Sequence, residues 1–159
     1  MSALENKVVI VTGGSSGIGR AAALSFAKQG AKVIVTGRRA AALKKTVAEH
    51  KNIVSVVADV ANPEDGPRTV AKAIDTWGRL DILVNNAGAG ALLPLRNSSA
   101  EQINAIFAVN VVGPSLLAAA ALPHLEATKG TIVNISSTFG QSLVRISPIT
   151  QPARLRSST

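Results

Sequence analysis

Three glycines near the start of the chain, Gly13, Gly17 and Gly19, have a spacing that could bring the backbone close to a phosphate. The apolar run Val8–Val11 precedes them, and an amphipathic pattern typical of a helix begins at Ile18. A turn without Cβ atoms at a helix N-terminus presents free N–H groups and the positive end of the helix dipole to an anion. A structural turn without a ligand is the alternative. The residues expected to bind a nucleotide at this turn are Thr12, Gly13, Ser15, Ser16, Gly17, Ile18 and Gly19.

Four more apolar runs follow, at residues 31–36, 53–58, 80–84 and 130–135, with helical patterns between them. Alternating strands and helices predict a parallel sheet with right-handed crossovers, in which ligands bind beyond the carboxyl ends of the strands. We therefore predict an α/β, Rossmann-like fold with three layers and five strands in the order 3-2-1-4-5. Polar or small residues that follow the strands should meet at one edge: Arg38, Asp59, residues 85–88 and Ser137.

The motifs at this edge resemble those of the short-chain dehydrogenase/reductase family in its single-domain form. They are Thr12-Gly13-x-x-x-Gly17-x-Gly19, Asp59-Val60, Asn85-Asn86-Ala87-Gly88, Asn110 and Ser137, and the resemblance covers residues ~5 to 141. It implies a dinucleotide on the glycine turn and adenine near Asp59 and Val60. It also implies that Asn86, Ala87 and Gly88 lie beside the adenosine, and that Ser137 orients the substrate.

The choice of cofactor can be argued from the residues after the second strand. Members that bind NAD are expected to carry an acidic residue there, which accepts hydrogen bonds from the ribose hydroxyls. This chain has Gly37 followed by Arg38 and Arg39. A guanidinium suits a 2′-phosphate, so NADP(H) is the predicted cofactor. The alternative for both arginines is a solvated helix start, where positive charge is electrostatically unfavourable.

Asn110 lies on the same helical stripe as Ile103, Ile106 and Phe107, so we expect its side chain to be buried and hydrogen-bonded. The resemblance implies that Asn110 supports a water chain to a catalytic lysine. A structural amide that props the helix is the alternative. For Ser136, next to Ser137, a turn hydroxyl is the favoured interpretation.

The resemblance fails at the catalytic pair. The family carries Tyr-x-x-x-Lys about thirteen residues beyond its serine: the tyrosine is the acid/base of hydride transfer, and the lysine lowers its pKa. This chain has no tyrosine, and no lysine follows Lys129. We therefore divide the chain into a dinucleotide-binding domain, residues 1–140, and an irregular tail outside the family pattern, residues 141–159.

The tail permits a second reading. With permissible codons for residues 149–159, the frame that starts at the third base of each codon can encode Tyr-Ala-Ala-Ser-Lys-Ala-Ala-Leu-Glu-His. That sequence contains the missing pair at about the right distance from Ser137. We infer a shift of reading frame between Gly140 and Ile149.

A member truncated in this way lacks the C-terminal helices and strands of the family. Strand five would become an edge with Ile132, Val133 and Ile135 short of cover. The apolar side of the long helix that ends near Leu125 would lose its neighbours as well; it carries Ile106, Phe107, Leu116 and Leu117. We expect a homo-oligomer formed through these surfaces.

Composition restricts the other classes of function. The net charge is +8, but the basic residues are scattered without interleaved aromatic residues, so no nucleic-acid partner is expected. We expect no run to approach the ~20 apolar residues that a membrane span needs, and no signal peptide ahead of the first strand. There is no cysteine, which excludes disulfides and thiolate metal sites and fits a cytoplasmic location. No metal site is predicted.

The preferred function is a truncated family member that binds NADP(H). It would descend from an oxidoreductase acting on carbonyl or alcohol substrates, with a small hydrophobic substrate in the remaining site. One alternative is a lyase or isomerase on the same scaffold, which would use Ser137 and Asn110 as hydrogen-bond donors. The other alternative is a non-catalytic binding or regulatory partner.

Overall fold

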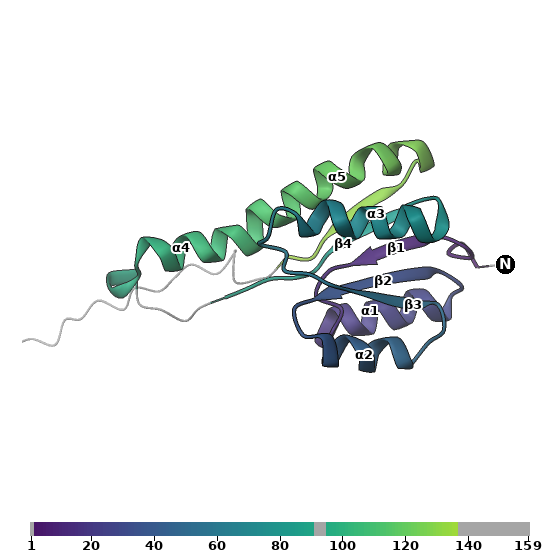
Figure 1. Ribbon diagram of the computed structural model, residues 1–159, viewed down its shortest axis with the longest axis horizontal. Coiled ribbons are helices and arrows are strands. Elements are labelled where there is room, and N and C mark those ends of the chain that lie inside the picture. The colour runs from purple at the N-terminus through teal and green to yellow at the C-terminus, as the bar shows by residue number, and fades with distance from the viewer. Residues whose placement is uncertain (1, 91–94, 137–159) are drawn as a thin grey trace, which may run out of the picture.

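A five-stranded parallel sheet forms the centre of the protein (Figure 1). The computed structural model describes residues 2–90 and 95–136; the tail of residues 141–159 and Ser137 lie outside these ranges. The strand order is β3-β2-β1-β4-β5, as predicted. The strands are β1 (Val8–Val11), β2 (Lys32–Gly37), β3 (Ile53–Val57), β4 (Ile82–Asn85) and β5 (Thr131–Asn134).

Two helices cover each face of the sheet, which gives the predicted three layers (Figure 1). On one face, α1 (Gly17–Lys28) and α2 (Ala40–Ala48) pack on Val9, Val11 and Val35. On the other, α3 (Asp65–Trp77) and α5 (Gly113–Thr128) pack on Val8 and Ile10. Because successive strand residues point to opposite faces, the continuous β-branched runs supply both cores.

The segment between β4 and β5 contains a short 3-10 helix, η1 (Leu95–Asn97), and then one long helical stretch. This stretch comprises α4 (Ala100–Phe107), the π-helix η2 (Ala108–Val112) and α5. It begins with a capping box in which the Ser99 side chain accepts from the Gln102 amide and the Gln102 side chain accepts from the Ser99 amide. No residue of α4 or η2 is buried, and Figure 1 shows α4 projecting away from the sheet. We call residues 100–112 the helical arm.

The helix Ala100–Thr128 is long and apolar enough to span a membrane by length and composition alone. Its most apolar 18-residue window has a mean hydropathy of 2.0, and 17% of that window is buried. The expectation that no run reaches this length was wrong, because alanine and valine continue the apolar pattern between the larger residues. The α5 part of the same helix buries Leu117, Ala121 and Leu125 against α3 and the sheet, as a helix of a layered domain does.

The expected exposure of the unpartnered surfaces is found for most of the named residues. Phe107, Leu116, Val133 and Ile135 are all exposed. Ile106 and Ile132 are half-buried, and Leu117 is buried in the core shared by α3 and α5. Strand β5 pairs with β4 alone among the described strands, so its other edge is open.

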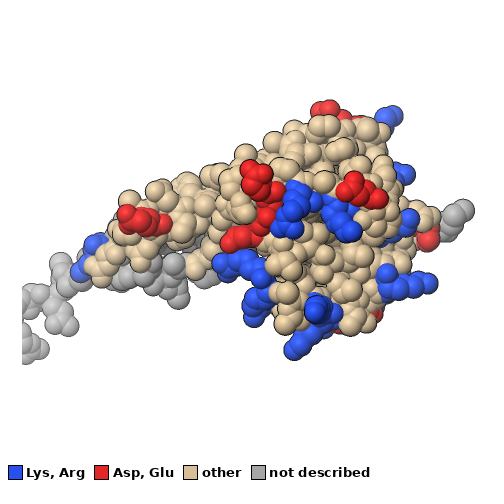
Figure 2. Space-filling model, in the orientation of Figure 1, with Lys and Arg blue, Asp and Glu red and all other residues tan. Residues whose placement is uncertain are grey.

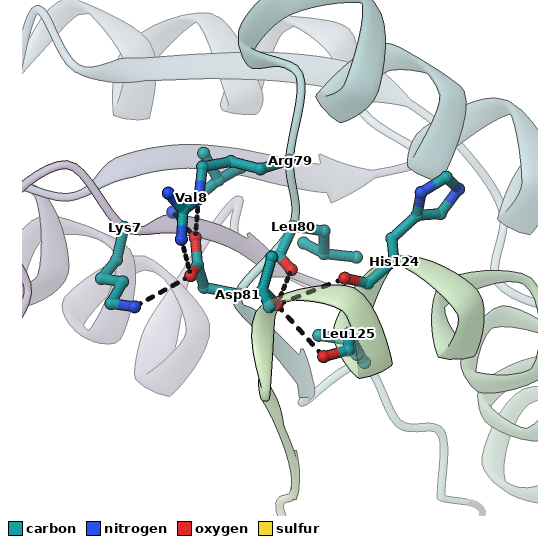
Figure 3. A network of polar contacts seen from close by, with 8 residues as sticks. Lys7, Val8, Arg79, Leu80, Asp81, His124 and Leu125 are labelled. Carbon is teal, nitrogen blue, oxygen red and sulfur yellow. Dashed lines mark hydrogen bonds and ion pairs between the residues drawn. The ribbon is translucent and has the colours of Figure 1, made fainter.

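A buried carboxylate joins the amino ends of β1 and β4, at the opposite end of the sheet from the predicted ligand edge (Figure 3). Asp81 Oδ2 accepts from the Val8 amide at 3.0 Å and from Arg79 Nε at 2.8 Å. Its Oδ1 accepts from Lys7 Nζ at 3.0 Å and from the Arg79 guanidinium at 2.6 Å. Close by, the Thr128 hydroxyl at the end of α5 donates to the Leu80 carbonyl at 2.7 Å.

Candidate nucleotide-binding site

The glycine turn connects β1 to α1 as predicted, and it leaves hydrogen-bond donors free. Gly13 and Gly17 have positive φ angles of 69° and 53°, so the backbone turns sharply before the helix. The N-cap Ser16 makes no capping hydrogen bond through its side chain, and the first turn of α1 contains no acidic residue. Among the described residues, the amides at positions 17–19 have no acceptor. They form the kind of donor cluster that binds phosphate at a helix N-terminus.

The glycine turn and the turn after β4 are packed into one unit. A Cβ on Gly19 would overlap Nδ2 of Asn86, so glycine is needed for this close approach. The Asn86 amide group donates to the Thr12 carbonyl at 2.8 Å. The Thr12 hydroxyl accepts from the backbone N–H groups of Asn86 and Ala87, each at 2.9 Å. Thr12 is thus a buried joint between the two turns.

A cavity of about 600 Å³ opens at the carboxyl edge of the sheet. The structure brings together at this cavity every residue predicted to bind the cofactor except Thr12. Sequence reasoning missed five further lining residues: Thr36, Gly37, Ala58, Ala89 and Val109. The ends of β2 and β3 supply the first three of these. These three residues could have been found from their position at the carboxyl end of an apolar run. They were missed because their side chains are small and carry no charge.

The rim of the cavity beside β2 is basic. Arg38 and Arg39 follow Gly37, line the cavity and are exposed. Neither guanidinium forms an ion pair within the described part of the chain. Figure 2 shows that Lys and Arg side chains gather over the body of the domain, whereas the helical arm is mainly neutral. Two unpaired guanidiniums beside free amides can hold a ligand that carries phosphates at both places.

The wall of the cavity beside β3 is held by a carboxylate. Asp65, the first residue of α3, accepts from the Asp59 amide at 2.7 Å and from the Arg68 guanidinium at 2.6 Å. The hydrogen bond from Arg68, then that from the Asp59 amide, holds the pKa of Asp65 below its ordinary value, although burial opposes them. Asp65 therefore stays ionised at neutral pH.

Asn110 lies in the π-helix η2 and is exposed, so the expectation that it is buried was wrong. The reason is that this helical stretch packs on the sheet only from α5 onwards, after Asn110. Its side chain is nevertheless fully engaged: Oδ1 accepts from the Ala89 amide at 2.9 Å, and Nδ2 donates to the Ala89 carbonyl at 2.7 Å. Asn110 thereby fixes the segment that follows Gly88. A π-helix of this kind often marks a functional position, but no sequence pattern announced it here.

Of the two serines that follow β5, Ser136 is within the described residues. It is exposed directly after β5, and the Ile135 amide before it donates to the Asn85 carbonyl at 2.9 Å. Ser137, the predicted substrate-orienting residue, lies outside the described residues. The carboxyl end of β5 therefore lies beside that of β4, next to the turn of residues 86–88.

Comparison with known proteins identifies the family. The family model of short chain dehydrogenases matches residues 7–148. An uncharacterised oxidoreductase of Thermotoga maritima is 40% identical over 86% of this chain and 55% of its own length. A putative ketoacyl reductase of granaticin polyketide synthase from Streptomyces violaceoruber is 39% identical over 86% of this chain and 57% of its own. A crystal structure of a short-chain dehydrogenase from Streptomyces avermitilis superposes with a TM-score of 0.82 and 37% identity, over 87% of this chain and 52% of that one.

The chain belongs to the short-chain dehydrogenase family. It spans about half the length of these relatives. The matched residues 7–148 of this chain include the glycine turn, the basic rim and the turn after β4.

Proposed function

We propose that this chain binds NADP(H) at the carboxyl edge of its sheet. One observation carries the proposal: two unpaired arginines and three free helix amides line the same cavity. The amides would hold the pyrophosphate, and the guanidiniums of Arg38 and Arg39 would hold the 2′-phosphate. The cofactor would supply hydride chemistry towards a carbonyl or alcohol, which is the chemistry of an oxidoreductase family.

We propose further that residues 1–159 bind the cofactor without turning it over, because they contain no tyrosine to serve as the acid/base. The interpretation of a shifted reading frame gains support from the family match, which ends at residue 148, directly before Ile149. Ile149 is the codon at which the alternative frame begins to encode Tyr-Ala-Ala-Ser-Lys. The active form would then be the product of the alternative frame, with the same cavity.

A fluorescence titration tests binding. The chain has a single tryptophan, Trp77, which is partly buried against the core, and bound NADPH should quench its emission. We expect saturable binding of NADPH and weaker binding of NADH. Absence of any saturable signal with NADPH, together with no heat in calorimetry, would contradict the proposal.

A second experiment tests turnover of NADPH. The chain of residues 1–159 should not consume NADPH with a panel of ketones and aldehydes. A variant gene in which the frame is shifted at codon 149, and which continues to its next stop codon, should consume NADPH. The nucleotide sequence decides first: if the shifted frame does not encode Tyr-x-x-x-Lys, the frame-shift interpretation is wrong, whereas the binding proposal stands.

We also propose that the helical arm forms a contact between two copies of the chain. Ile103, Phe107 and Val111 recur every four residues along the arm and are all exposed, Phe107 by 55%. The open edge of β5 is a second exposed apolar surface, which carries Val133 and Ile135. Exposed apolar surfaces of this kind mark interaction sites.

The substitution Phe107→Glu should weaken that contact. Burying a phenylalanine side chain is worth about 1.5–3 kcal/mol, and a buried glutamate would oppose association as well. We expect light scattering after size exclusion to show an oligomer for the natural chain and a shift towards monomer for the variant. Ala105→Glu introduces the same charge at an exposed residue on the opposite side of the arm and should leave the mass unchanged. A natural chain that elutes as a monomer would contradict the proposal.

A further inference from the structure

We infer that Asp65 is a positioning residue for the cofactor: with Arg68, it fixes the cavity wall formed by residues 58–60. The inference rests on the proposed binding of NADP(H) at this cavity. Ala58, Asp59 and Val60 line the cavity, whereas Asp65 and Arg68 do not. Asp65 would therefore act on the ligand through the backbone that it holds.

The first contact joins the start of α3 to the end of β3. Asp65 Oδ2 accepts from the backbone N–H of Asp59 at 2.7 Å, a short and charge-assisted hydrogen bond. Asp59 is the second residue after β3, at the point where the chain leaves the sheet. Its backbone direction at this point determines where the wall of the cavity stands.

The second contact closes a bridge through Arg68. The Arg68 guanidinium donates to Asp65 Oδ1 at 2.6 Å and to the Val57 carbonyl at 2.7 Å. The side chain of Asp65 is 14% exposed and that of Arg68 is 53% exposed. The carboxylate is thus the sheltered centre of the bridge, while the arginine covers it from the solvent side. The bridge spans Val57 and Asp59, on either side of Ala58.

The rest of the loop is fixed from within and from the opposite side. Asp59 Oδ1 accepts from the Ala61 amide at 3.0 Å, so the Asp59 side chain is already used to close the turn. The Val60 carbonyl lies against Gly113 at the start of α5, so closely that a Cβ on Gly113 would overlap it. Asp65 provides the remaining contact of this loop, because it accepts the hydrogen bond from the Asp59 backbone N–H.

Only a carboxylate meets both demands at position 65. Its two oxygens accept from different donors, the Asp59 amide and the Arg68 guanidinium. An asparagine has one acceptor and one donor group on the same frame. Whichever way its amide turns, either the Asp59 N–H or the Arg68 guanidinium faces an NH₂ group. Asp65→Asn is therefore a nearly isosteric test of the bridge.

We expect Asp65→Asn to weaken binding of 2′,5′-ADP, the adenosine half of NADP, about tenfold. A tenfold loss corresponds to about 1.4 kcal/mol, which is the scale of one charge-assisted hydrogen bond to the backbone. Arg68→Gln removes the bridge to Val57 but leaves the acceptor for the Asp59 amide, so its loss should be smaller, roughly threefold. Isothermal calorimetry well below the unfolding midpoint measures each affinity.

Two control variants separate positioning from simple loss of stability. Asp81→Asn should lower the stability from the far end of the sheet, yet it should bind 2′,5′-ADP as the natural chain does. Asp75→Asn changes an exposed acid on α3, outside the cavity, and should alter neither property. A loss of affinity at Asp65 that Asp81→Asn does not reproduce identifies a positioning role.

The outcomes are distinct. If the natural chain fails to bind 2′,5′-ADP, the proposed cofactor is wrong and the positioning role falls with it. If the natural chain binds and Asp65→Asn binds within twofold of it, the positioning role alone is overturned. If Asp65→Asn does not fold, Arg68→Gln decides, and an unchanged affinity in that variant overturns the inference.

Discussion

Replacing Arg38 by aspartate should lower the affinity for NADPH by about 100-fold or more, while the affinity for NADH stays level or rises. A 100-fold loss corresponds to about 2.8 kcal/mol. Hydrogen bonds between charged groups contribute about 1.5–3 kcal/mol each, and the new carboxylate would also repel the 2′-phosphate. The same carboxylate could accept hydrogen bonds from the ribose hydroxyls of NADH, because it follows the end of β2.

The structure makes this test a clean one. Arg38 is exposed and forms no ion pair with a described residue, so its replacement leaves no partner charge unpaired. The single variants Arg38→Ser and Arg39→Ser measure how much of the NADPH affinity each guanidinium contributes. Lys44→Asp makes the same change of charge at an exposed position of α2 outside the cavity. It should have little effect at 0.15 M salt, where the Debye length is about 8 Å.

Specificity is measured by titrating each variant with NADPH, NADH and 2′,5′-ADP under one set of conditions. The ratio of NADPH affinity to NADH affinity should fall in the variants of Arg38 or of Arg39. It should stay unchanged in Lys44→Asp. Equal losses for NADPH and NADH in Arg38→Asp would mean that the arginines do not recognise the 2′-phosphate. The basic rim would then serve another purpose.

The sheet and the ligand edge could be predicted because both follow from local patterns. The β-branched runs at Val8–Val11 and residues 31–36 are typical of strands buried on both faces, and both faces are covered by helices. Since the carboxyl ends of parallel strands meet, the residues that follow each strand share one cavity. For this reason the lining residues could be named without knowledge of any contact between them.

The remainder depended on contacts between residues far apart in the chain. The Thr12 hydroxyl is occupied by amides 74 and 75 residues later, so Thr12 holds the turns together and does not line the cavity. Asn110 was placed on an apolar stripe, but the arm departs from the sheet, so the stripe at that point faces solvent. The spacing of apolar residues along a helix does not show which part of the helix packs on the sheet.

The two most connected carboxylates gave no signal in the sequence. Asp65 and Asp81 sit in no motif, and a charged residue before an apolar run normally remains in solvent. Both are sheltered because donors converge on them: Arg68 and the Asp59 amide on one, and Lys7, Arg79 and the Val8 amide on the other. The donors of Asp81 come together only when β1 pairs with β4, whereas those of Asp65 lie within six residues and depend on the turn between β3 and α3.

Replacing Asp81 by asparagine should lower the free energy of unfolding by about 2–3 kcal/mol at neutral pH. The side chain of Asp81 is 3% exposed, and three donor groups converge on its two oxygens. An asparagine can still accept from the Val8 amide, but its NH₂ group would then face Lys7 and Arg79. Loss of one partner of a buried pair costs about 3–5 kcal/mol, and the partial exposure of both cations reduces that figure.

The expected effect is well outside that of an ordinary surface change. For a domain of this size, it corresponds to a fall of roughly 5–10 °C in Tm. Unfolding in urea, followed by the fluorescence of Trp77, measures it directly. Asp75→Asn is the matched control, since Asp75 is an exposed acid with no ion pair or side-chain hydrogen bond to another described residue. Its effect should stay within about 0.5 kcal/mol.

The dependence on pH gives the prediction a second, independent readout. Burial alone raises the pKa of Asp81, but the hydrogen bonds from Arg79, the Val8 amide and Lys7 outweigh it and hold the pKa below its ordinary value. A carboxyl whose pKa is lower in the folded state stabilises that state fully above the unfolded pKa of about 3.9, and loses this contribution as the pH falls towards the folded pKa. The difference between the natural chain and Asp81→Asn should therefore be largest near neutral pH and should shrink below about pH 4. A difference that stays constant down to pH 3 would assign the destabilisation to altered packing, and equal stability of the two proteins at pH 7 would show that the convergence of donors on Asp81 does not stabilise the fold.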